Sequence, residues 1–472
     1  LELTCTTMSS AHTLSRQHDF PSDFVWGVAT SSFQIEGAAH ADGKGPSIWD
    51  TFCQVPGAIA DASDGLIACE HYERWQEDVA LIASLGVKAY RFSISWPRVQ
   101  PLGQGEFNEA GLQFYAQLVD GLLAKGIAPY VTLNHWDLPQ ALQDQGGWAN
   151  RDTVQHFVNY ASAIFKCLGN RVAAYTTHNE PWVIAVLGHE SGIFAPGLKS
   201  RAIAAHVSHH LLLSHGMTLQ ALRAQGCTVP LGIVLNLSPT VPATPSAADQ
   251  AKALLEDGRL LRWYMDPLFK QAYPQDVIDD LGEQAPHIEP GDLEIIATPI
   301  DYLGVNYYTR SVVSADGSWK PQNSGLPLND MDWEIIPECL TQLLVRMHHD
   351  YPLPPIYITE NGGAFPDPLR DGQVNDQDRI AYIDQHIAAI GHARDQGVQV
   401  QGYMVWSLMD NFEWSSGYSK RFGIVHVDYA TQERTCKASA HWYRDFLAYQ
   451  RQQKASSQIS PPGELNSLTG VV

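Results

Sequence analysis

The sequence predicts an α/β fold, a single (β/α)8 TIM barrel with long βα loops. Three observations support this prediction. Strand-like and helix-like runs alternate from Phe24 to about Tyr449, the strand-like runs number eight, and no series of Asn-Gly or Asp-Gly hairpin turns interrupts them. Because strands that alternate with helices pair in parallel, eight such units over 472 residues are typical of a closed barrel.

Each expected strand is a short apolar run bounded by turn residues, which is typical of strands buried on both faces. The eight runs cover residues 25–32, 87–95, 127–134, 173–179, 229–237, 301–308, 356–360 and 401–408. Helices are expected between them, where apolar residues recur at helical spacing. These stripes begin at Tyr72, Leu112, Phe157, Ala204, Ile380 and Trp442. Asn108 is the expected N-cap of the second stripe, and Gly126 is expected to end it.

No Ser/Gly-rich linker divides the chain, so we expect one domain over residues 20–451. A flexible leader is expected at 1–19 and a disordered tail at 452–472. Residues 1–15 lack the apolar segment of a signal peptide, and no run is apolar and long enough to cross a bilayer. The seven cysteines contain no Cys-Xaa-Xaa-Cys pair, which predicts reduced thiols. Together these features predict a cytoplasmic protein.

The charge balance indicates which partners to expect. The chain has 51 acidic and 30 basic side chains, a formal net charge of −21. A strongly acidic chain disfavours binding to nucleic acid and to anionic membrane surfaces. A small neutral molecule, such as a sugar, is the partner that this balance permits most easily.

Two glutamates end buried runs and carry the strongest chemical signal. They lie in Thr177-His178-Asn179-Glu180-Pro181 and in Ile358-Thr359-Glu360-Asn361-Gly362. A buried carboxylate is costly unless it is paired or used. Cleavage of a glycosidic bond needs two carboxyl groups, one to protonate the leaving oxygen and one to attack the sugar or activate water. The two segments therefore indicate a glycosidase if the fold brings them together.

A (β/α)8 barrel would bring them together, because its chemistry lies at the carboxyl ends of the strands. Glu180 and Glu360 end the fourth and seventh expected strands. Polar and aromatic residues end three others: His135 and Trp136 the third, Asn306 and Tyr308 the sixth, and Trp406 the eighth. We expect all of these side chains at one mouth of the barrel.

Four motifs in the chain resemble glycoside hydrolase family 1. They are Phe-Xaa-Trp-Gly-Xaa-Ala-Thr-Ser-Ser-Phe-Gln-Ile-Glu-Gly at 24–37, Thr-His-Asn-Glu-Pro-Trp at 177–182, Ile-Thr-Glu-Asn-Gly at 358–362 and Asp-Asn-Phe-Glu-Trp at 410–414. The resemblance extends from about Phe20 to Phe446. It implies a (β/α)8 barrel with the activity of a retaining β-glycosidase, most often a β-glucosidase.

Carried over by position, the resemblance implies that Glu180 is the general acid/base and Glu360 the nucleophile, with Arg91 and Tyr308 beside the nucleophile. It also implies that sugar hydroxyls are bound by Gln34, His135, Asn179 and Glu413, and sugar faces by Trp136, Trp406 and Trp414. Asn306, Trp333 and Phe422 complete the expected substrate-binding set, and Trp182, Leu187 and Trp333 are expected to line the entrance. No cofactor or metal is expected.

The catalytic pair needs two protonation states. We expect Arg91 and Tyr308 to keep Glu360 ionised, and the charge on Glu360 to raise the pKa of Glu180. Relatives that cleave 6-phospho-β-glycosides resemble this chain but place a serine at the position of Glu413, so this glutamate predicts an unphosphorylated sugar. One departure from the family is His178, at a position that is more often apolar; its side chain should point away from the face of Asn179.

The expected partners are β-glucosides and glucose, with cellobiose, short cello-oligosaccharides and aryl or alkyl β-glucosides as substrates. A broad β-glycosidase acting on galactosides or fucosides stays open as an alternative, as do a 6-phospho-β-glucosidase and a non-catalytic sugar-binding barrel. A metal-dependent barrel hydrolase is disfavoured, because the first strand is expected to continue into Ser32-Phe33-Gln34-Ile35-Glu36 without a His-Xaa-His. Structural roles are expected for four histidines on one leucine-rich helix: His206, His209, His210 and His215. The sequence predicts no particular oligomeric state.

Overall fold

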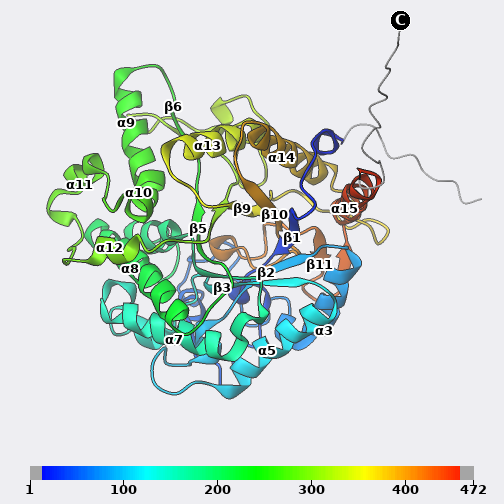
Figure 1. Cartoon of the computed structure of the whole chain (residues 1–472), viewed down its shortest axis with the longest axis horizontal. Coiled ribbons are helices and arrows are strands. Elements are labelled where there is room, and N and C mark those ends of the chain that lie inside the picture. The colour runs from blue at the N-terminus through cyan, green and yellow to red at the C-terminus, as the bar shows by residue number, and fades with distance from the viewer. Residues whose placement is uncertain (1–12, 458–472) are drawn as a thin grey trace, which may run out of the picture.

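The computed structural model describes residues 13–457. At its centre, eight parallel strands close into a barrel in the order β1-β10-β9-β7-β5-β4-β3-β2 (Figure 1). The barrel strands are β1 (Val25–Ala29), β2 (Ala89–Ser93), β3 (Ala128–Asn134), β4 (Ala174–Asn179), β5 (Leu231–Asn236), β7 (Tyr302–Asn306), β9 (Ile356–Asn361) and β10 (Val400–Trp406). The predicted (β/α)8 barrel is confirmed, with all eight strands where the apolar runs lie.

The first strand is shorter than expected. It ends at Ala29, and Ser32 is the first residue of a short helix, α1 (Ser32–Ile35), so the predicted continuation of the strand was wrong. The backbone leaves the ladder because the Ser32 amide donates to the Ser93 hydroxyl, while the Ser31 hydroxyl donates to the Gln34 side chain. Local side-chain bonds of this kind compete with strand pairing.

Long helices surround the barrel, as Figure 1 shows. They are α3 (His71–Ser84), α5 (Glu109–Ala124), α7 (Asp152–Leu168), α8 (Arg201–Ala224), α13 (Pro337–Asp350), α14 (Gln377–Asp395) and α15 (Ala438–Ser457). The six expected stripes all lie in helices. Asn108 does occupy the N-cap position of α5, but its side chain makes no capping bond and donates instead to the carbonyls of Asp42 and Arg98.

The loops contain shorter elements. The helices among them are α2 (Ile48–Phe52), α4 (Trp96–Val99), α6 (Gln140–Gln143), α9 (Ala247–Asp257), α10 (Trp263–Lys270), α11 (Gln275–Leu281) and α12 (Asp292–Ile296). Short 3-10 helices are η1 (Leu14–Gln17), η2 (Gly147–Ala149), η3 (Gly169–Arg171), η6 (Gly282–Gln284), η7 (Pro321–Asn323) and η8 (Trp414–Ser416), and π-helices are η4 (Val183–Glu190) and η5 (Gly258–Arg262). Two strand pairs were not expected: parallel β6 (Thr240–Pro242) with β8 (Ser311–Val313), and antiparallel β11 (Val425–Val427) with β12 (Arg434–Cys436).

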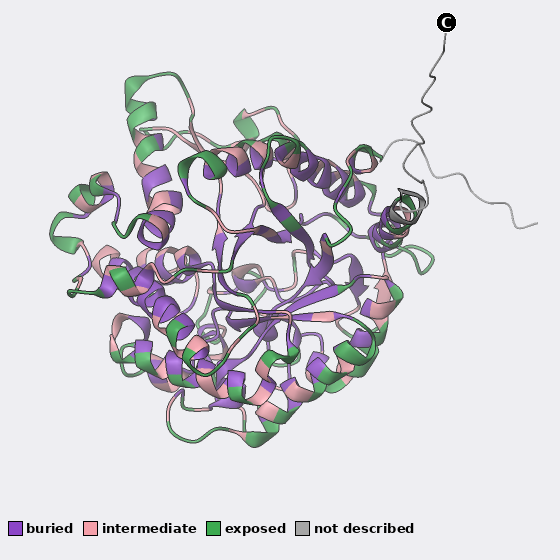
Figure 2. Cartoon of the chain, viewed as in Figure 1, coloured by how far each residue is buried: buried purple, intermediate pink, exposed green. Residues whose placement is uncertain are grey.

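The barrel strands are buried almost throughout, whereas exposed residues lie on the outer faces of the helices and in loops (Figure 2). The strands are covered by the helices outside and by side chains inside, which is why the sequence shows continuous apolar runs here rather than alternation. None of the helices in the described range combines the length and hydropathy needed to cross a membrane.

Both expected terminal segments are described in part. Within the leader, η1 binds to α14: the Leu14 and Ser15 amides and the Ser15 hydroxyl all donate to the buried Asp384 carboxylate. At the other end, α15 continues to Ser457, beyond the start expected for the tail. The rest of the leader and tail, residues 1–12 and 458–472, lies outside the described residues. The six cysteines that the structure describes are free.

Candidate active site

A cavity of about 470 Å³ opens at the carboxyl ends of the barrel strands. Of the residues predicted to be catalytic or to bind the substrate, eleven line it: His135, Trp136, Glu180, Asn306, Tyr308, Trp333, Glu360, Trp406, Glu413, Trp414 and Phe422. Three others, Gln34, Arg91 and Asn179, do not line it but lie buried beside it. The barrel therefore brings together residues that are separated by hundreds of positions in the chain.

Glu360 lies in β9 and is held through both of its oxygens. Arg91, from β2, donates from Nη1 to Oε1 at 2.6 Å, and the phenol of Tyr308 donates to Oε2 at 2.6 Å. All three side chains are buried or nearly so. Gly362 allows β10 to approach this segment, because a Cβ there would lie 1.7 Å from the carbonyl oxygen of Trp406. One oxygen of the carboxylate thus faces an arginine and the other a phenol.

Glu180 is the residue after β4, and its backbone is in the left-handed region, with φ of 50°. This conformation is unfavourable for a residue with a Cβ and is found most often where structure around a functional site imposes it. The Glu180 amide donates to the Val234 carbonyl of β5, and Pro181 follows directly. The carboxylate accepts a hydrogen bond of 2.6 Å from Asn306 Nδ2, whose own oxygen is fixed by the Thr359 hydroxyl.

The two carboxyl groups differ in electrostatic surroundings. Burial and the nearby Glu360 raise the pKa of Glu180 to about 8. Burial also raises the pKa of Glu360, while the ion pair with Arg91 and the hydrogen bond from Tyr308 oppose that rise. Because the positive charge contacts Glu360 directly, a single proton shared by the pair resides on Glu180. This order of the two pKa values is the one predicted from the sequence, whereas the effect of burial on Glu360 was not predicted.

Asn179 fixes the protonation of the neighbouring histidine. Its oxygen accepts from Arg91 and Asn306, so its nitrogen is the atom that donates to His135 Nε2, at 3.2 Å. Burial and Arg91 hold the pKa of His135 well below its ordinary value, so the imidazole is neutral and carries its hydrogen on Nδ1.

Three buried polar atoms of residues that line the cavity have no hydrogen-bond partner within the described chain: Nδ1 of His135, Oε2 of Glu413 and Oγ1 of Thr240. The first is a donor. Burial and the charge on Glu360 raise the pKa of Glu413 to about 8, so this carboxyl can both donate and accept at neutral pH. Buried polar groups without partners are uncommon in proteins. On a cavity wall they suit a ligand with several hydroxyl groups.

Gln34 is hydrogen-bonded on both sides within the protein. Its amide nitrogen donates to the Asn411 side chain and the Phe412 carbonyl, and its oxygen accepts from Ser31. Both amide hydrogens are thus used within the protein, and the side chain ties α1 to the loop that carries Glu413. Gln34 is buried beside the cavity, and its bond to the Phe412 carbonyl lies next to Glu413; its predicted contact with a sugar hydroxyl stays a prediction.

Indole rings form one side of the cavity. His135 is stacked between Trp406 and Trp414, with ring centroids 5.8 and 5.9 Å away and interplanar angles of 16° and 15°. Trp136 contacts Trp414 at 4.4 Å and donates from Nε1 to the Asn179 carbonyl. Aromatic faces of this kind cover the C–H faces of a pyranose ring.

The outer part of the cavity is more apolar. Trp182 and Leu187, both expected at the entrance, line it together with residues that the sequence analysis missed: Phe194, Leu260, Met331, Glu256 and Arg310. Arg310 pairs with the buried Glu334 at 2.5 Å, so its charge is largely neutralised. The missed residues lie in long loops that carry no recognisable motif, and only their position in space identifies them.

The histidines on α8 all have partners in the surrounding protein. His209 bonds Tyr273 and Asp292, His210 the Trp148 carbonyl, His215 the Thr177 hydroxyl, and His206 the Ala202 carbonyl. His178 points away from the cavity, as expected from strand alternation, and lies between Asn134 and Ser214. These contacts assign the histidines to packing between α8 and its neighbours.

Chemically, the cavity combines a protonated carboxyl group, an ionised carboxyl group beside an arginine, and hydrogen-bonding groups on an aromatic wall. This set can protonate a leaving oxygen and attack the carbon attached to it.

Comparisons with known proteins agree with that chemistry. The sequence model of Glycosyl hydrolase family 1 matches residues 16–452. Beta-glucosidase A of Acetivibrio thermocellus is 45% identical over 438 residues, which cover 91% of this chain and 98% of that protein. A bifunctional β-D-glucosidase/β-D-fucosidase of Bifidobacterium breve is 42% identical, over 91% of this chain and 98% of its own. The family 1 β-glucosidase of Thermotoga maritima in complex with isofagomine lactam superposes with a TM-score of 0.89 at 43% identity, covering 92% of this chain and 99% of that one.

Proposed function

The chain belongs to glycosyl hydrolase family 1, and we propose that it is a retaining β-glucosidase acting through Glu180 and Glu360. Its substrates are β-glucosides with a free non-reducing glucosyl end: cellobiose, short cello-oligosaccharides and aryl or alkyl β-glucosides. The observation that carries this proposal is the difference between the two carboxyl groups. Glu360 contacts the Arg91 guanidinium, whereas Glu180 is bonded by the neutral amide of Asn306. Relatives named β-glucosidases, at about 45% identity over nearly their whole length, support it.

In the first step, an oxygen of Glu360 attacks the anomeric carbon while Glu180 gives its proton to the glycosidic oxygen, so that the aglycone leaves as an alcohol or phenol. The product is a glucosyl ester of Glu360. Formation of the ester removes the charge on Glu360 that raises the pKa of Glu180, so Glu180 becomes the stronger acid and is ionised.

In the second step, Glu180 takes a proton from water as the water oxygen attacks the anomeric carbon. The ester bond breaks, Glu360 leaves as a carboxylate beside Arg91, and β-glucose is released. Two displacements at the same carbon retain the β configuration. Tyr308 and Arg91 stabilise the leaving carboxylate in this step, because both hydrogen bonds are stronger to the charged form.

Recognition of the glucosyl unit is proposed for the inner wall. His135 Nδ1 and Glu413 Oε2, each without a partner in the described part of the chain, bind ring hydroxyls, and Asn179 holds His135 in the donor tautomer. Trp406 and Trp414 cover the sugar faces. A site that matches specific hydroxyls rejects an analogue lacking one, because its own buried groups stay unpaired.

The loop around Glu413 argues against a phosphorylated sugar. Glu413 supplies no positive charge to a phosphate, whether protonated or ionised, and two nearby residues that could bind one, Lys420 and Tyr418, are already engaged. Lys420 donates to the Asp330 carbonyl and the Tyr418 hydroxyl to the Asp64 carbonyl. A broader specificity is the second candidate, since one relative is named as a bifunctional glucosidase and fucosidase.

A proton NMR time course with an aryl β-glucoside tests the proposal. We expect β-glucose to appear first and α-glucose to accumulate only by mutarotation, and we expect Glu360→Gln to abolish turnover. Early appearance of α-glucose would exclude the double-displacement mechanism. Parallel runs with the aryl β-galactoside, β-fucoside and 6-phospho-β-glucoside separate the alternatives, and faster turnover of the phosphorylated substrate would exclude the proposed sugar specificity.

A further inference from the structure

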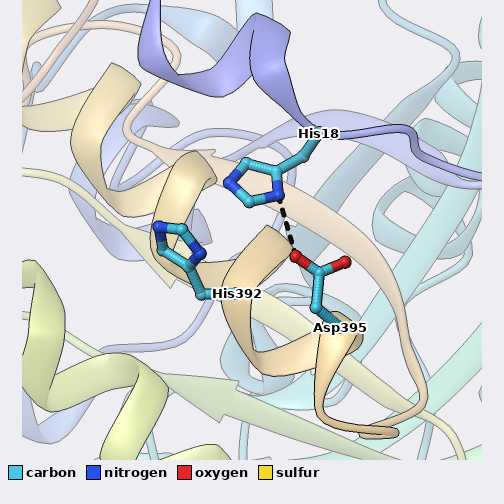
Figure 3. Close-up of side chains that lie close together, drawn as sticks. All are labelled: His18, His392 and Asp395. Carbon is cyan, nitrogen blue, oxygen red and sulfur yellow. Dashed lines mark ion pairs between the residues drawn. The ribbon is translucent and has the colours of Figure 1, made fainter.

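A cluster of metal-ligating side chains lies on the outside of the barrel, on α14 and the segment after η1. Figure 3 shows His18, His392 and Asp395 pointing toward one another. One ligand atom from each residue lies within 4.8 Å of one atom from each of the others. His392 and Asp395 are three positions apart in the last turn of α14, and therefore lie on one face of the helix.

The position of His18 is fixed by the fold. The segment before it is held on α14 by three hydrogen bonds to Asp384. Its imidazole packs directly on the helix backbone at Gly391, where any Cβ would lie 2.2 Å from the ring. The side chain of His18 is only 11% exposed, so it is largely immobilised in this orientation. One of the three ligating side chains is thus preorganised before any ion binds.

The distances suit a small divalent ion. His18 Nδ1 and Asp395 Oδ2 lie 3.3 Å apart. Two ligands at Zn²⁺ bond lengths of about 2.0–2.2 Å are separated by about 3.3 Å in a tetrahedral arrangement. His392 completes the set from the other side, with its ring edge-on to His18 at a centroid distance of 4.5 Å.

His392 has the freedom to complete the site. It is exposed, and neither of its ring nitrogens has a hydrogen-bond partner within residues 13–457. Asp395 is 68% exposed and bonds only His18 in the same range. Both side chains can therefore move toward a common centre by rotation without breaking a buried contact.

We propose that His18, His392 and Asp395 form a binding site for Zn²⁺ or a similar divalent transition ion, with water as a fourth ligand. Two imidazoles and one carboxylate are ligands that Zn²⁺ takes readily, and an overall charge of −21 favours cation binding. The ion joins the N-terminal segment to the end of α14. It is separate from the proposed catalytic site, none of whose residues belongs to the cluster.

The consequence is mass-action stabilisation. An ion that binds only the folded state raises the free energy of unfolding as its concentration exceeds its Kd. This applies here because His18 is far from His392 and Asp395 in the sequence, so that unfolding separates the ligands. Because His18 directly follows η1, we also expect bound zinc to protect the segment around η1 from proteolysis.

The test is a zinc titration of the full chain after dialysis against a chelator, followed by calorimetry and thermal unfolding. We expect one site per chain and a melting temperature at least about 2 °C higher at 100-fold excess over Kd. His392→Ala, an exposed substitution that leaves the fold intact, should remove both effects, as should His18→Ala. His441→Ala, which removes an exposed histidine on α15, is the matched control and should keep them.

A Co²⁺ titration followed by visible absorption adds a readout of ligand geometry, with four-coordinate bands expected for the parent and lost in His392→Ala. If the parent binds no zinc, or if both cluster variants bind it as tightly as the parent, the proposal is wrong. None of these measurements uses turnover. The metal-site proposal can therefore be refuted without affecting the glucosidase proposal, and the glucosidase proposal can be refuted without affecting the metal site.

Discussion

The phenol of Tyr308 donates a 2.6 Å hydrogen bond to Oε2 of Glu360, the oxygen that Arg91 does not contact. Burial and the neighbouring glutamates raise the pKa of Tyr308 well above its ordinary value, so it stays a donor at every pH of interest. This bond favours the charged form of Glu360 and opposes the rise in its pKa that burial causes.

Tyr308→Phe should therefore raise the pKa of Glu360 and move the acidic limb of the pH profile of kcat/KM to higher pH. We expect kcat/KM at neutral pH to fall by about 10- to 100-fold, because this is the rate change that corresponds to the free energy of one hydrogen bond to a charged group. Tyr307→Phe is the control, since it removes a hydroxyl that bonds the Ile336 carbonyl. An unchanged acidic limb in Tyr308→Phe would show that the phenol does not support the charge on Glu360.

The alkaline limb should report Glu180. With its pKa raised to about 8 by burial and by Glu360, the proton needed by the leaving group is lost above that pH, and kcat/KM should fall there. Asn306 donates to Glu180 and favours its charged form. Asn306→Ala should therefore move this alkaline limb to higher pH and lower kcat/KM. Initial-rate measurements from pH 5 to 10 will detect both changes. A limb that stays in place would mean that another group controls it.

Glu413 should destabilise the folded protein at neutral pH. Burial raises its pKa from 4.5 to about 8, so the folded state keeps a proton that the unfolded chain releases. The folded state is therefore fully favoured below pH 4.5 and loses stability as pH rises from there to 8. Glu413→Gln should raise the free energy of unfolding at pH 7.5 by roughly 1–3 kcal/mol and change it little at pH 4.5.

Thermal unfolding at both pH values measures this effect, and activity should fall in the same variant because a hydroxyl-binding carboxyl group is lost. Glu433→Gln, at an exposed position, is the control and should leave stability unchanged at both pH values. Equal or lower stability of Glu413→Gln at pH 7.5 would contradict the assigned cost of burying this group.

The sequence was sufficient to find the barrel and most of the cavity wall, for a physical reason. Strands buried on both faces are continuous apolar runs, so a polar residue at the end of such a run, as at Glu180, Asn306 and Glu360, marks the mouth. The strand pairs β6–β8 and β11–β12 are too short to show a period, and tertiary contacts determine them.

Other features depend on geometry that no local pattern encodes. The hydrogen bond from the Gln34 amide to the Asn411 side chain depends on where the first strand ends and α1 begins. The cluster of His18, His392 and Asp395 joins distant parts of the chain, while the histidines of α8, which are close in sequence, bind separate partners. The structural roles expected for the α8 histidines agree with these contacts, whereas no sequence pattern indicated that His18, His392 and Asp395 lie together.

Leu187 should control aglycone preference. It lines the outer cavity beside Trp182 and Phe194 and is not among the residues proposed to bind the glucosyl unit. Leu187→Trp fills space on the aglycone side, so the ratio of kcat/KM for a small aryl glucoside to that for cellobiose should change by about 5-fold or more. The ratio for aryl glucoside to aryl galactoside should stay within 2-fold of the parent. Equal changes in both ratios, or loss of thermal stability alone, would exclude this role.

His178 should position the loop after β3 from behind the cavity. Its Nδ1 accepts from Asn134, whose oxygen accepts from the Trp136 amide at 3.3 Å, and its Nε2 donates to Ser214. Burial holds its pKa well below the ordinary value, so the ring is neutral and supplies one acceptor and one donor. Trp136 is in the left-handed region, with φ of 79°, and therefore depends on such support.

His178→Leu leaves the Asn134 amide buried without its partner, which should lower the free energy of unfolding by about 2 kcal/mol and kcat/KM by several-fold. Adding Asn134→Leu removes the unpaired amide, so the double variant should recover stability. It should not recover kcat/KM, because the bond that holds the Trp136 backbone is still missing. Thermal unfolding and steady-state kinetics on the three variants separate the two effects, and joint recovery of stability and activity would reduce His178 to a packing residue.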